Sequence, residues 1–383
     1  MASQHENKNK NKNMAEPIWS THGVGPLAAG EDRPVLSAST EDDTGSAWEF
    51  RRVAIVGAGA MGTSLAAILG KVVPVVLVCR NPDRAMQVFR DGVRTTGLLE
   101  ATARPVVVQS MADILSVGGA SAIFVATKTS AIAQIAADLK PILPEMADHP
   151  GGVCVVSYQN GIETGRQLLA QLDHPQVLRM VLAFGAIMNR QTGIVNVTLN
   201  HPPHSIGTID PAYINRCKAI AKALSQGGME TVYDKNIEQS VWEKGILNAS
   251  ANPVAALVNA SVGEILASPA KTIVAGLLKE GVSVAQAEGL ALGEDYLARC
   301  WRFLEQAHAH IPSMVDDIRS GRETEVGQLN RQIINHGKRL GIPTPTHDVI
   351  DALIETFDWK VYRQHQHQHQ QESSVQSRPY TGS

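Results

Sequence analysis

Three polar side chains in the second half of the chain are spaced so that they could bind and protonate an anionic small molecule. Lys244, Asn248 and Asn252 lie four residues apart. At 3.6 residues per turn, this spacing places them on one face of a helix. One cation and two neutral amides suit a ligand rich in anionic oxygens. The alternative is a solvated helix face with two scattered amides, and the surrounding elements must decide between the two.

The composition is that of a globular protein without a strong charge bias. The chain has 383 residues, 44% hydrophobic and 19% charged, with a formal net charge of -3. This length allows two or three domains, and the charge gives no reason to expect nucleic acid as a partner. No apolar run approaches the ~18–20 residues of a membrane span. The N-terminus lacks the apolar core of a signal peptide, so we expect a cytoplasmic location and no membrane partner.

We predict neither a disulfide framework nor a metal site. The four cysteines are widely spaced and form no C-x-x-C pair, which favours reduced structural thiols. The segment His201-Pro-Pro-His204 has no carboxylate or cysteine beside it and is more typical of a turn. A flexible His tract at 365–369 could hold a metal adventitiously, without a biological role.

A glycine-rich turn near the start of the ordered sequence predicts a dinucleotide site. It follows the short apolar run Arg52–Val56 and precedes a helix-like segment that Gly70 ends. Its residues are Gly57, Ala58, Gly59, Ala60, Met61 and Gly62. This is G-x-G-x-x-G in its required strand–turn–helix setting. The first glycine permits the tight turn, the second lets backbone N–H groups approach a pyrophosphate, and the third lets helix and strand pack closely.

The end of the second strand favours NADP(H) over NAD(H). An NAD site usually has Asp or Glu there to bond the ribose 2′-hydroxyl. Here Val75–Cys79 is followed by Arg80, which could pair with a 2′-phosphate, helped by Arg84. The alternative is a surface arginine that happens to follow a strand. Asp83 is the nearest acid, but its position after Asn81-Pro82 is more typical of a helix start.

The alternation of elements predicts the fold class, an α/β Rossmann-type doubly wound sheet. Apolar strands are expected at 121–126 and 153–157, each followed by a helical segment. Lys128 and Asn160 follow these two strands. Ligands of such sheets bind beyond the carboxyl ends of the strands, so each residue could reach a cofactor ribose or a substrate. Each could equally be an ordinary loop residue.

From residue 236 onward the pattern is almost entirely helical, with predicted breaks that include Pro253. We therefore expect a Rossmann domain over 48–234 and an all-α domain over 235–363. Disordered tails are expected over 1–47 and 364–383, where polar and low-complexity sequence prevails. Ser313 could cap a helix or face a ligand carboxylate. Glu325 is placed on the helix after Gly321, where a surface acid is the alternative.

Together these motifs resemble those of ketopantoate reductases (2-dehydropantoate 2-reductases), over roughly residues 50–360. The glycine turn is generic, whereas the later features are distinctive. The matching features are Gly57–Gly62, Arg80, Lys128-Thr129, Gln159-Asn160-Gly161, Trp242-Glu-Lys244…Asn248…Asn252-Pro253, Pro312-Ser-Met…Asp317-Ile…Gly321-Arg…Thr324-Glu325 and Gly341-Ile-Pro-Thr-Pro345. Val262 departs from the pattern, because some members have a substrate-contacting asparagine there.

The resemblance implies an NADP-binding Rossmann domain joined to a helical domain related to that of 6-phosphogluconate dehydrogenase. It implies reduction of 2-dehydropantoate to (R)-pantoate in pantothenate synthesis. By position, Lys244 becomes the general acid, and Glu325 becomes an acid that contacts the cofactor or orients the lysine. The implied substrate contacts are Asn160, Asn248, Asn252 and Ser313. Besides the glycine turn and Arg80, the implied cofactor contacts are Lys128, Asn160 and Glu325.

Elementary chemistry agrees with a lysine in this role. Hydride arriving at a ketone carbon leaves an alkoxide, which needs a proton, and a lysine in a partly desolvated cleft has its pKa lowered toward the working pH. Ketol-acid reductoisomerase is a rival, but it needs clustered carboxylates for two Mg²⁺ ions. A paralogous reductase of another 2-keto acid and a non-catalytic NADPH sensor are the remaining alternatives. The apolar helices of the second half are compatible with a homodimer.

Overall fold

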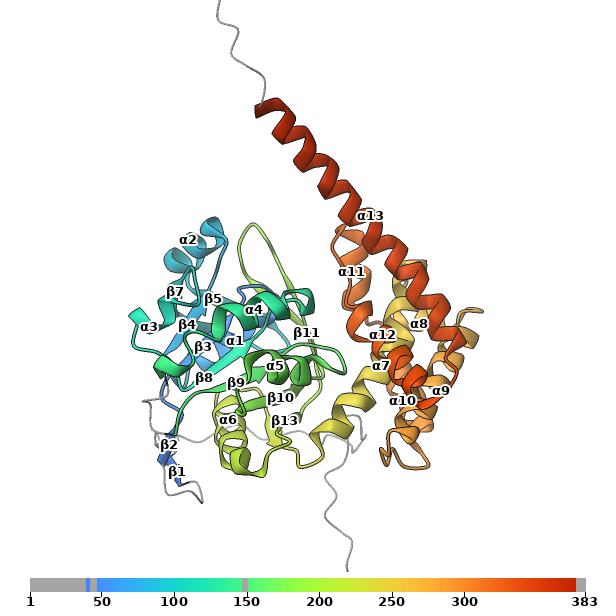
Figure 1. Cartoon of the computed structure of the whole chain (residues 1–383), viewed down its shortest axis with the longest axis horizontal. Helices are drawn as coiled ribbons and strands as arrows, with labels where there is room; N and C mark the ends of the chain where they lie inside the picture. The colour runs from blue at the N-terminus through green and yellow to red at the C-terminus, as the bar shows by residue number, and fades with distance from the viewer. Residues whose placement is uncertain (1–38, 42–46, 147–150, 377–383) are drawn as a thin grey trace, which may run out of the picture.

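The computed structural model describes residues 39–41, 47–146 and 151–376. A sheet-based half and a helical half lie side by side, and α7 (Ile237–Val258) runs from one into the other (Figure 1). The predicted fold class is confirmed: a mainly parallel sheet with helices on both faces is followed by an all-α region. The last strand ends at Tyr233, so the predicted boundary near residue 234 falls in the short link before α7.

The main sheet has eight strands in the order β14-β13-β10-β9-β8-β3-β4-β7. Its strands are β3 (Val53–Val56), β4 (Val75–Val78), β7 (Val106–Val108), β8 (Ala122–Val125), β9 (Cys154–Ser157), β10 (Val177–Val181), β13 (His204–Gly207) and β14 (Thr231–Tyr233). From β7 to β10 all neighbours are parallel, whereas β13 runs antiparallel to β10. The chain winds outward from β3 in one direction and then returns to β8 on the other side. The glycine turn after β3 therefore lies at the point where the strand order reverses, the usual ligand position of this fold.

Helices cover both faces of the main sheet because its strands are buried on both sides, as expected for parallel strands. One face carries α1 (Ala60–Leu69) and α6 (Ile214–Gln226), and the other carries α4 (Ile132–Leu139) and α5 (Thr164–Leu172). The helix α2 (Pro82–Asp91) follows β4, and the single-turn α3 (Asp113–Ser116) follows β7. A smaller sheet, β11-β12-β5-β6, packs beside α1. Its strands are β5 (Val93–Gly97), β6 (Ala101–Ala103), β11 (Phe184–Met188) and β12 (Val195–Asn200).

The helical half has its own apolar core around α7. Its remaining helices are α8 (Val262–Leu266), α9 (Lys271–Ala287), α10 (Tyr296–Gln306), α11 (Ser313–Arg319), α12 (Asn330–Leu340) and α13 (Pro345–Gln376). Ile162, Val181 and Ala183 of the sheet-based half belong to the same buried cluster. The two halves are therefore joined by apolar packing as well as by α7. In the part of the chain that the structure describes, no helix is long and apolar enough to cross a membrane.

Several sequence-based predictions differ from the structure. Strand β10 was not predicted, because Arg179 interrupts its apolar run Val-Leu-Arg-Met-Val. α7 does not break at Pro253 but continues to Val258. The predicted disordered segments 1–47 and 364–383 lie partly outside the described residues. Within them, β1 (Ser39–Glu41) pairs with β2 (Ala47–Glu49), and α13 reaches Gln376, because no glycine or proline ends it.

Candidate active site

The glycine turn adopts the tight geometry that its sequence predicts. Gly57 has a φ of +110°, a conformation that only glycine adopts readily. A Cβ on Gly62 would lie 1.8 Å from the Gly57 carbonyl oxygen, so only glycine allows the helix this close to the turn. A Cβ on Gly59 would meet nothing within 4 Å. α1 begins at Ala60, inside the glycine motif, so Ala60, Met61 and Gly62 form its first turn.

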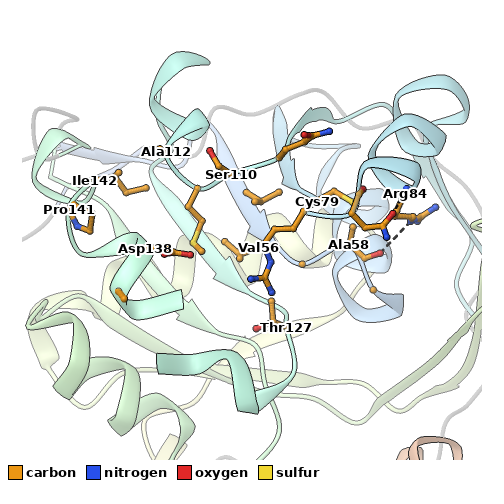
Figure 2. Close-up of a pocket in the computed structure, with 18 residues that line it drawn as sticks. Val56, Ala58, Cys79, Arg84, Ser110, Ala112, Thr127, Asp138, Pro141 and Ile142 are labelled. Carbon is orange, nitrogen blue, oxygen red and sulfur yellow. Dashed lines mark hydrogen bonds between the residues drawn. The ribbon is translucent and has the colours of Figure 1, made fainter. Parts of the chain in front are cut away.

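A cavity of about 670 Å³ opens beside this turn, at the carboxyl ends of β3, β4 and β8. Gly57, Ala58 and Gly59 form one wall. Figure 2 shows Ala58 and Arg84 on one side of the hollow, with Ser110, Thr127 and Asp138 around it. Size and position suit the adenosine and pyrophosphate half of a dinucleotide, which binds where the strand order reverses.

The two arginines after β4 have different surroundings. Arg80 is exposed and lines the cavity. Arg84 is half-buried, and its guanidinium donates to the Ala58 carbonyl (3.4 Å) and to the Thr63 hydroxyl (3.0 Å; Figure 2 marks the first). It also donates to Gln87 at 2.6 Å. Arg84 thus supports the glycine turn through these contacts. Asp83 lies in the first turn of α2, as predicted.

The predicted substrate-binding residues meet in a second cavity of about 120 Å³. Lys244, Asn248 and Asn252 point into it from α7, and Ser313 lines it from the start of α11. The helix cap of α11 is Pro312, not Ser313, whose hydroxyl makes no cap bond. The rest of the wall is mostly apolar: Leu182, Ala183, Phe184, Gly185, Leu199, Leu247, Ala251, Val262, Phe303, Leu304, Ala307 and His310, with Asn160 at the edge.

The polar face of α7 survives Pro253 because another helix compensates for it. A proline has no N–H, so the carbonyl four residues earlier, that of Ala249, loses its usual helical partner. The side-chain amide of Asn330 on α12, which is fully buried, donates to this carbonyl at 2.9 Å. Asn330 thus satisfies the one acceptor that Pro253 leaves open. The helix therefore stays continuous through Asn248 and Asn252.

A chain of hydrogen bonds crosses between the two halves at Lys244. Its ammonium donates to the Asn160 side-chain oxygen at 2.8 Å. The Asn160 amide in turn donates to a Glu325 carboxylate oxygen at 3.4 Å. Burial and the neighbouring Arg179 guanidinium lower the pKa of Lys244 to about 8, against an opposing effect of Glu325. Burial raises the pKa of Glu325.

Glu325 and Lys128 do not lie quite as the sequence predicts. Glu325 precedes the short 3-10 helix Val326–Gln328 in the turn after α11, rather than lying on a helix. Lys128 follows β8 as expected, but its ammonium forms an ion pair with Asp317 of α11. Asp317 is buried, and Lys128 does not line the cavity at the glycine turn. The two halves are therefore tied at this edge as well.

Arg179 is a site residue that sequence reasoning missed. It is a buried cation on β10, and its guanidinium donates to Ser157 at 2.8 Å and also to Thr164 and the Gly161 carbonyl. These contacts fix the position of the segment that follows Asn160. The available signal was an arginine inside an apolar run, which is unusual in a buried strand unless the charge has a use.

Hydrogen bonds of Gln159 connect two loops that contribute to the walls of the two cavities. Its side-chain amide donates to the carbonyls of Thr127 and Lys128, both at 3.1 Å. Thr127 lines the cavity at the glycine turn. Asn160, which follows Gln159 in the sequence, lines the cavity of Lys244. Within the described ranges, no group of three or more His, Cys, Asp or Glu side chains is arranged to hold a metal ion. The four cysteines are free and buried.

Comparison with known proteins covers both halves. The family model described as ketopantoate reductase PanE/ApbA matches residues 53–210, and the model of its C-terminal part matches residues 236–357. The 2-dehydropantoate 2-reductase of Halobacterium salinarum is 26% identical over 305 residues, which are 79% of this chain and 97% of that protein. The enzyme of the same name from Archaeoglobus fulgidus is 26% identical over 76% of this chain and 92% of its own length.

Solved structures share the fold. A PanE/ApbA family ketopantoate reductase from Ralstonia eutropha superposes with a TM-score of 0.71 at 24% identity, covering 81% of this chain and 99% of that one. A D-mandelate dehydrogenase, solved with NADH and anilino(oxo)acetate, superposes with a TM-score of 0.70 at 22% identity and the same coverage. At these identities the likeness concerns the architecture of two domains.

Proposed function

Since the chain belongs to the ketopantoate reductase family PanE/ApbA, we propose that it reduces 2-dehydropantoate to (R)-pantoate with NADPH, a step of pantothenate synthesis. The family makes the chain an oxidoreductase that uses a nicotinamide cofactor. The observation that supports the finer assignment most is the position of Lys244. Its ammonium donates to Asn160 in the loop after β9, and Asn248, Asn252 and Ser313 line the same cavity from two helices.

The residues present fit a dinucleotide. The open side of Gly59, where a Cβ would meet nothing within 4 Å, leaves room for a pyrophosphate against the turn. The first turn of α1 presents free N–H groups there. We assign the pyrophosphate to Gly57–Gly62 and the 2′-phosphate to Arg80. Asn160, Lys128 and Glu325 are assigned to the nicotinamide end, which supplies the hydride when the cofactor is bound.

Lys244 is the proton donor in this proposal. Hydride addition turns the keto oxygen into an alkoxide, and the ammonium both stabilises this charge and neutralises it by giving up a proton. A pKa of about 8 keeps most of the lysine protonated at neutral pH while making proton transfer easier than from an ordinary lysine. Asn160 holds the ammonium in place and joins it to Glu325.

The amides and the hydroxyl are assigned to substrate orientation. Asn248, Asn252 and Ser313 face the same cavity as Lys244 without adding charge. They can hold the 2-keto carboxylate by hydrogen bonds and fix its keto carbon toward the sheet-based half. These donors are neutral. A second cation in their place would bind the substrate carboxylate tightly without binding the transition state any more tightly.

A second candidate is the reduction of another 2-keto acid. The walls beyond the polar residues of this cavity are apolar, with Phe184 and Phe303 among them. A structural neighbour is a D-mandelate dehydrogenase, and Val262 stands where some family members have an asparagine. A non-catalytic NADPH sensor is the third candidate, but a sensor would not need the buried ammonium of Lys244 as a proton donor.

Oxidation of NADPH with ketopantoate and with a panel of 2-keto acids tests these candidates together. Ketopantoate should give the highest kcat/KM, and NADH should be the poorer cofactor. A higher kcat/KM for an aromatic or branched 2-keto acid would establish the second candidate. Tight NADPH binding without turnover of any member would establish the sensor. The expected cytoplasmic location, and the homodimer through the helical half, remain part of the proposal.

A further inference from the structure

His336 of α12 joins the two halves of the molecule next to the candidate active site. Its Nε2 lies 3.1 Å from a carboxylate oxygen of Glu163, which follows β9 in the sheet-based half. Its Nδ1 contacts the carboxylate of Glu288, at the end of α9 in the helical half. All three side chains are largely buried, with 15%, 18% and 19% of His336, Glu163 and Glu288 exposed. The imidazole thus bridges two carboxylates, one from each half.

The ring is held firmly in this place. The indole of Trp242 packs against it edge to face, with the ring centroids 4.8 Å apart. Trp242 lies two residues before Lys244 on α7. The ring therefore contacts the helix that carries the candidate proton donor and the loop that carries its partner.

The charged ring can bond to both carboxylates at once. When both nitrogens are protonated, each donates to a carboxylate. Arg339 lies 2.8 Å from Nδ1 and also donates to Glu288, so a cation stands beside the carboxylate that Nδ1 contacts. The bonds to Glu163 and Glu288 also raise the pKa of His336. The charged groups around the ring are Glu163, Glu288 and Arg339.

Glu163 is coupled to the residue that holds the ammonium. It lies three positions after Asn160 in a short loop, and the Ile162 N–H between them donates to the Gln328 carbonyl of the helical half at 3.0 Å. Gly161 has a φ of +111°, and a Cβ there would lie 2.7 Å from the Gln328 side chain. The loop is therefore pressed against the helical half, and displacement of Glu163 would displace Asn160.

We propose that His336 is a positioning residue for the reductase: its hydrogen bond to Glu163 latches loop 159–163 onto the helical half and so holds Asn160 against Lys244. This inference rests on the proposed function only for the effect on turnover. It predicts that a neutral side chain that donates to Glu163 from the place of Nε2 can replace the imidazole.

Two substitutions separate the two sides of the ring. A glutamine places its amide near the position of Nε2 and an asparagine near that of Nδ1. His336→Gln should keep the bond to Glu163 and hold kcat within about threefold of wild type, whereas His336→Asn should keep only the bond to Glu288 and lower kcat about tenfold or more. The Kd for NADPH should stay unchanged in both. Neither variant should shift the pH at which kcat falls.

Two further variants complete the test: one removes the carboxylate that His336 contacts, and the other is a control. Glu163→Ala should match His336→Asn in kcat, and the double variant should lose no more than either alone, because both remove the same contact. Arg166→Gln breaks the neighbouring ion pair with Glu238 in the first turn of α7, and the Arg166 side chain is 56% exposed. It should leave kcat unchanged.

Hydrogen–deuterium exchange of the peptide that covers residues 159–163 gives a readout independent of turnover. Exchange of the Ile162 amide should be faster in His336→Asn than in wild type and unchanged in His336→Gln. Equal effects of the two substitutions on exchange, or no effect of either, would overturn the latch. If exchange follows the prediction but no 2-keto acid is reduced by wild-type protein, the proposed function fails and the latch stands.

Discussion

At the scale of single residues, the surroundings of the Lys244 ammonium make it a better acid than an ordinary lysine. Burial removes water that would stabilise the charge of Lys244, and the nearby positive charge of Arg179 repels the ammonium. Asn160 compensates in part by accepting a hydrogen bond at 2.8 Å. These opposing effects keep the lysine charged near neutral pH and ready to lose its proton.

The pH dependence of kcat follows from this balance. Because the pKa of Lys244 is lowered to about 8, the proposed proton donor carries its proton below that pH and loses it as pH rises through it. The rate of keto-acid reduction should therefore be flat from about pH 6 to 7 and should fall about tenfold per unit well above 8. Stopped-flow measurement of the reduction step over this range checks it. A rate that stays constant to pH 10 would show that a group of ordinary lysine pKa, or no proton donor, is involved.

The part played by Arg179 can be separated from that of burial. Arg179→Met removes a cation beside Lys244 and should move the fall in kcat to higher pH, since the ammonium is then easier to keep charged. Arg179→Lys keeps a cation and should leave the fall near its original position while disturbing loop 159–163. The same pH–rate measurement distinguishes the two variants, and a downward shift in Arg179→Met would be the wrong sign for this explanation.

At the scale of elements, α12 supports α7 beside Pro253 through the bond from Asn330 to the Ala249 carbonyl. Asn330→Ala should leave the Ala249 carbonyl unsatisfied in a buried place and lower the free energy of unfolding by about 1–3 kcal/mol. Asn335→Ala, at an exposed position of the same helix, is the matched control and should change it by less than about 0.5 kcal/mol. Urea unfolding monitored by circular dichroism measures both. Equal stability of the two variants would mean that Ala249 finds another donor.

The glycine turn gives a prediction that separates folding from cofactor binding. A Cβ on Gly59 meets no protein atom within 4 Å, so Gly59→Ala should fold with nearly unchanged stability. The same Cβ points into the space assigned to the pyrophosphate, and the Kd for NADPH should rise by about tenfold or more. Titration of protein fluorescence with NADPH, beside a thermal melt, measures both. Unchanged affinity would place the pyrophosphate elsewhere.

Much of the element pattern could be predicted from the sequence, because apolar runs and glycine positions are local signals. The strand–turn–helix at Gly57–Gly62 and the polar face of α7 are examples. Strand β10 could not, because its use of Arg179 depends on Gly161 in the loop after β9 and on Thr164 at the start of α5. The continuity of α7 through Pro253 could not either, since it depends on Asn330, 81 residues away from its acceptor.

At the scale of the whole molecule, the site exists only where the two halves meet. Asn160 is 84 residues from Lys244 and 165 from Glu325 in sequence, yet it bonds to both. Lys128 and Asp317 form a further tie, and His336 with Glu163 another. Spacing within one helix could predict that Lys244, Asn248 and Asn252 share a face. Contacts between distant segments have no such local signal, so the hydrogen bonds of Asn160 to Lys244 and Glu325 could not be predicted from the sequence.

If the ammonium of Lys244 protonates the product of hydride transfer, Lys244→Ala removes the proton donor itself. The kcat for ketopantoate should fall by about 10²–10⁴, while the Kd for NADPH from fluorescence titration changes by less than about threefold. Lys279→Ala, on the exposed side of α9, should leave both unchanged. Near-normal turnover in Lys244→Ala would contradict the account, because the cavity would then work without its proton donor.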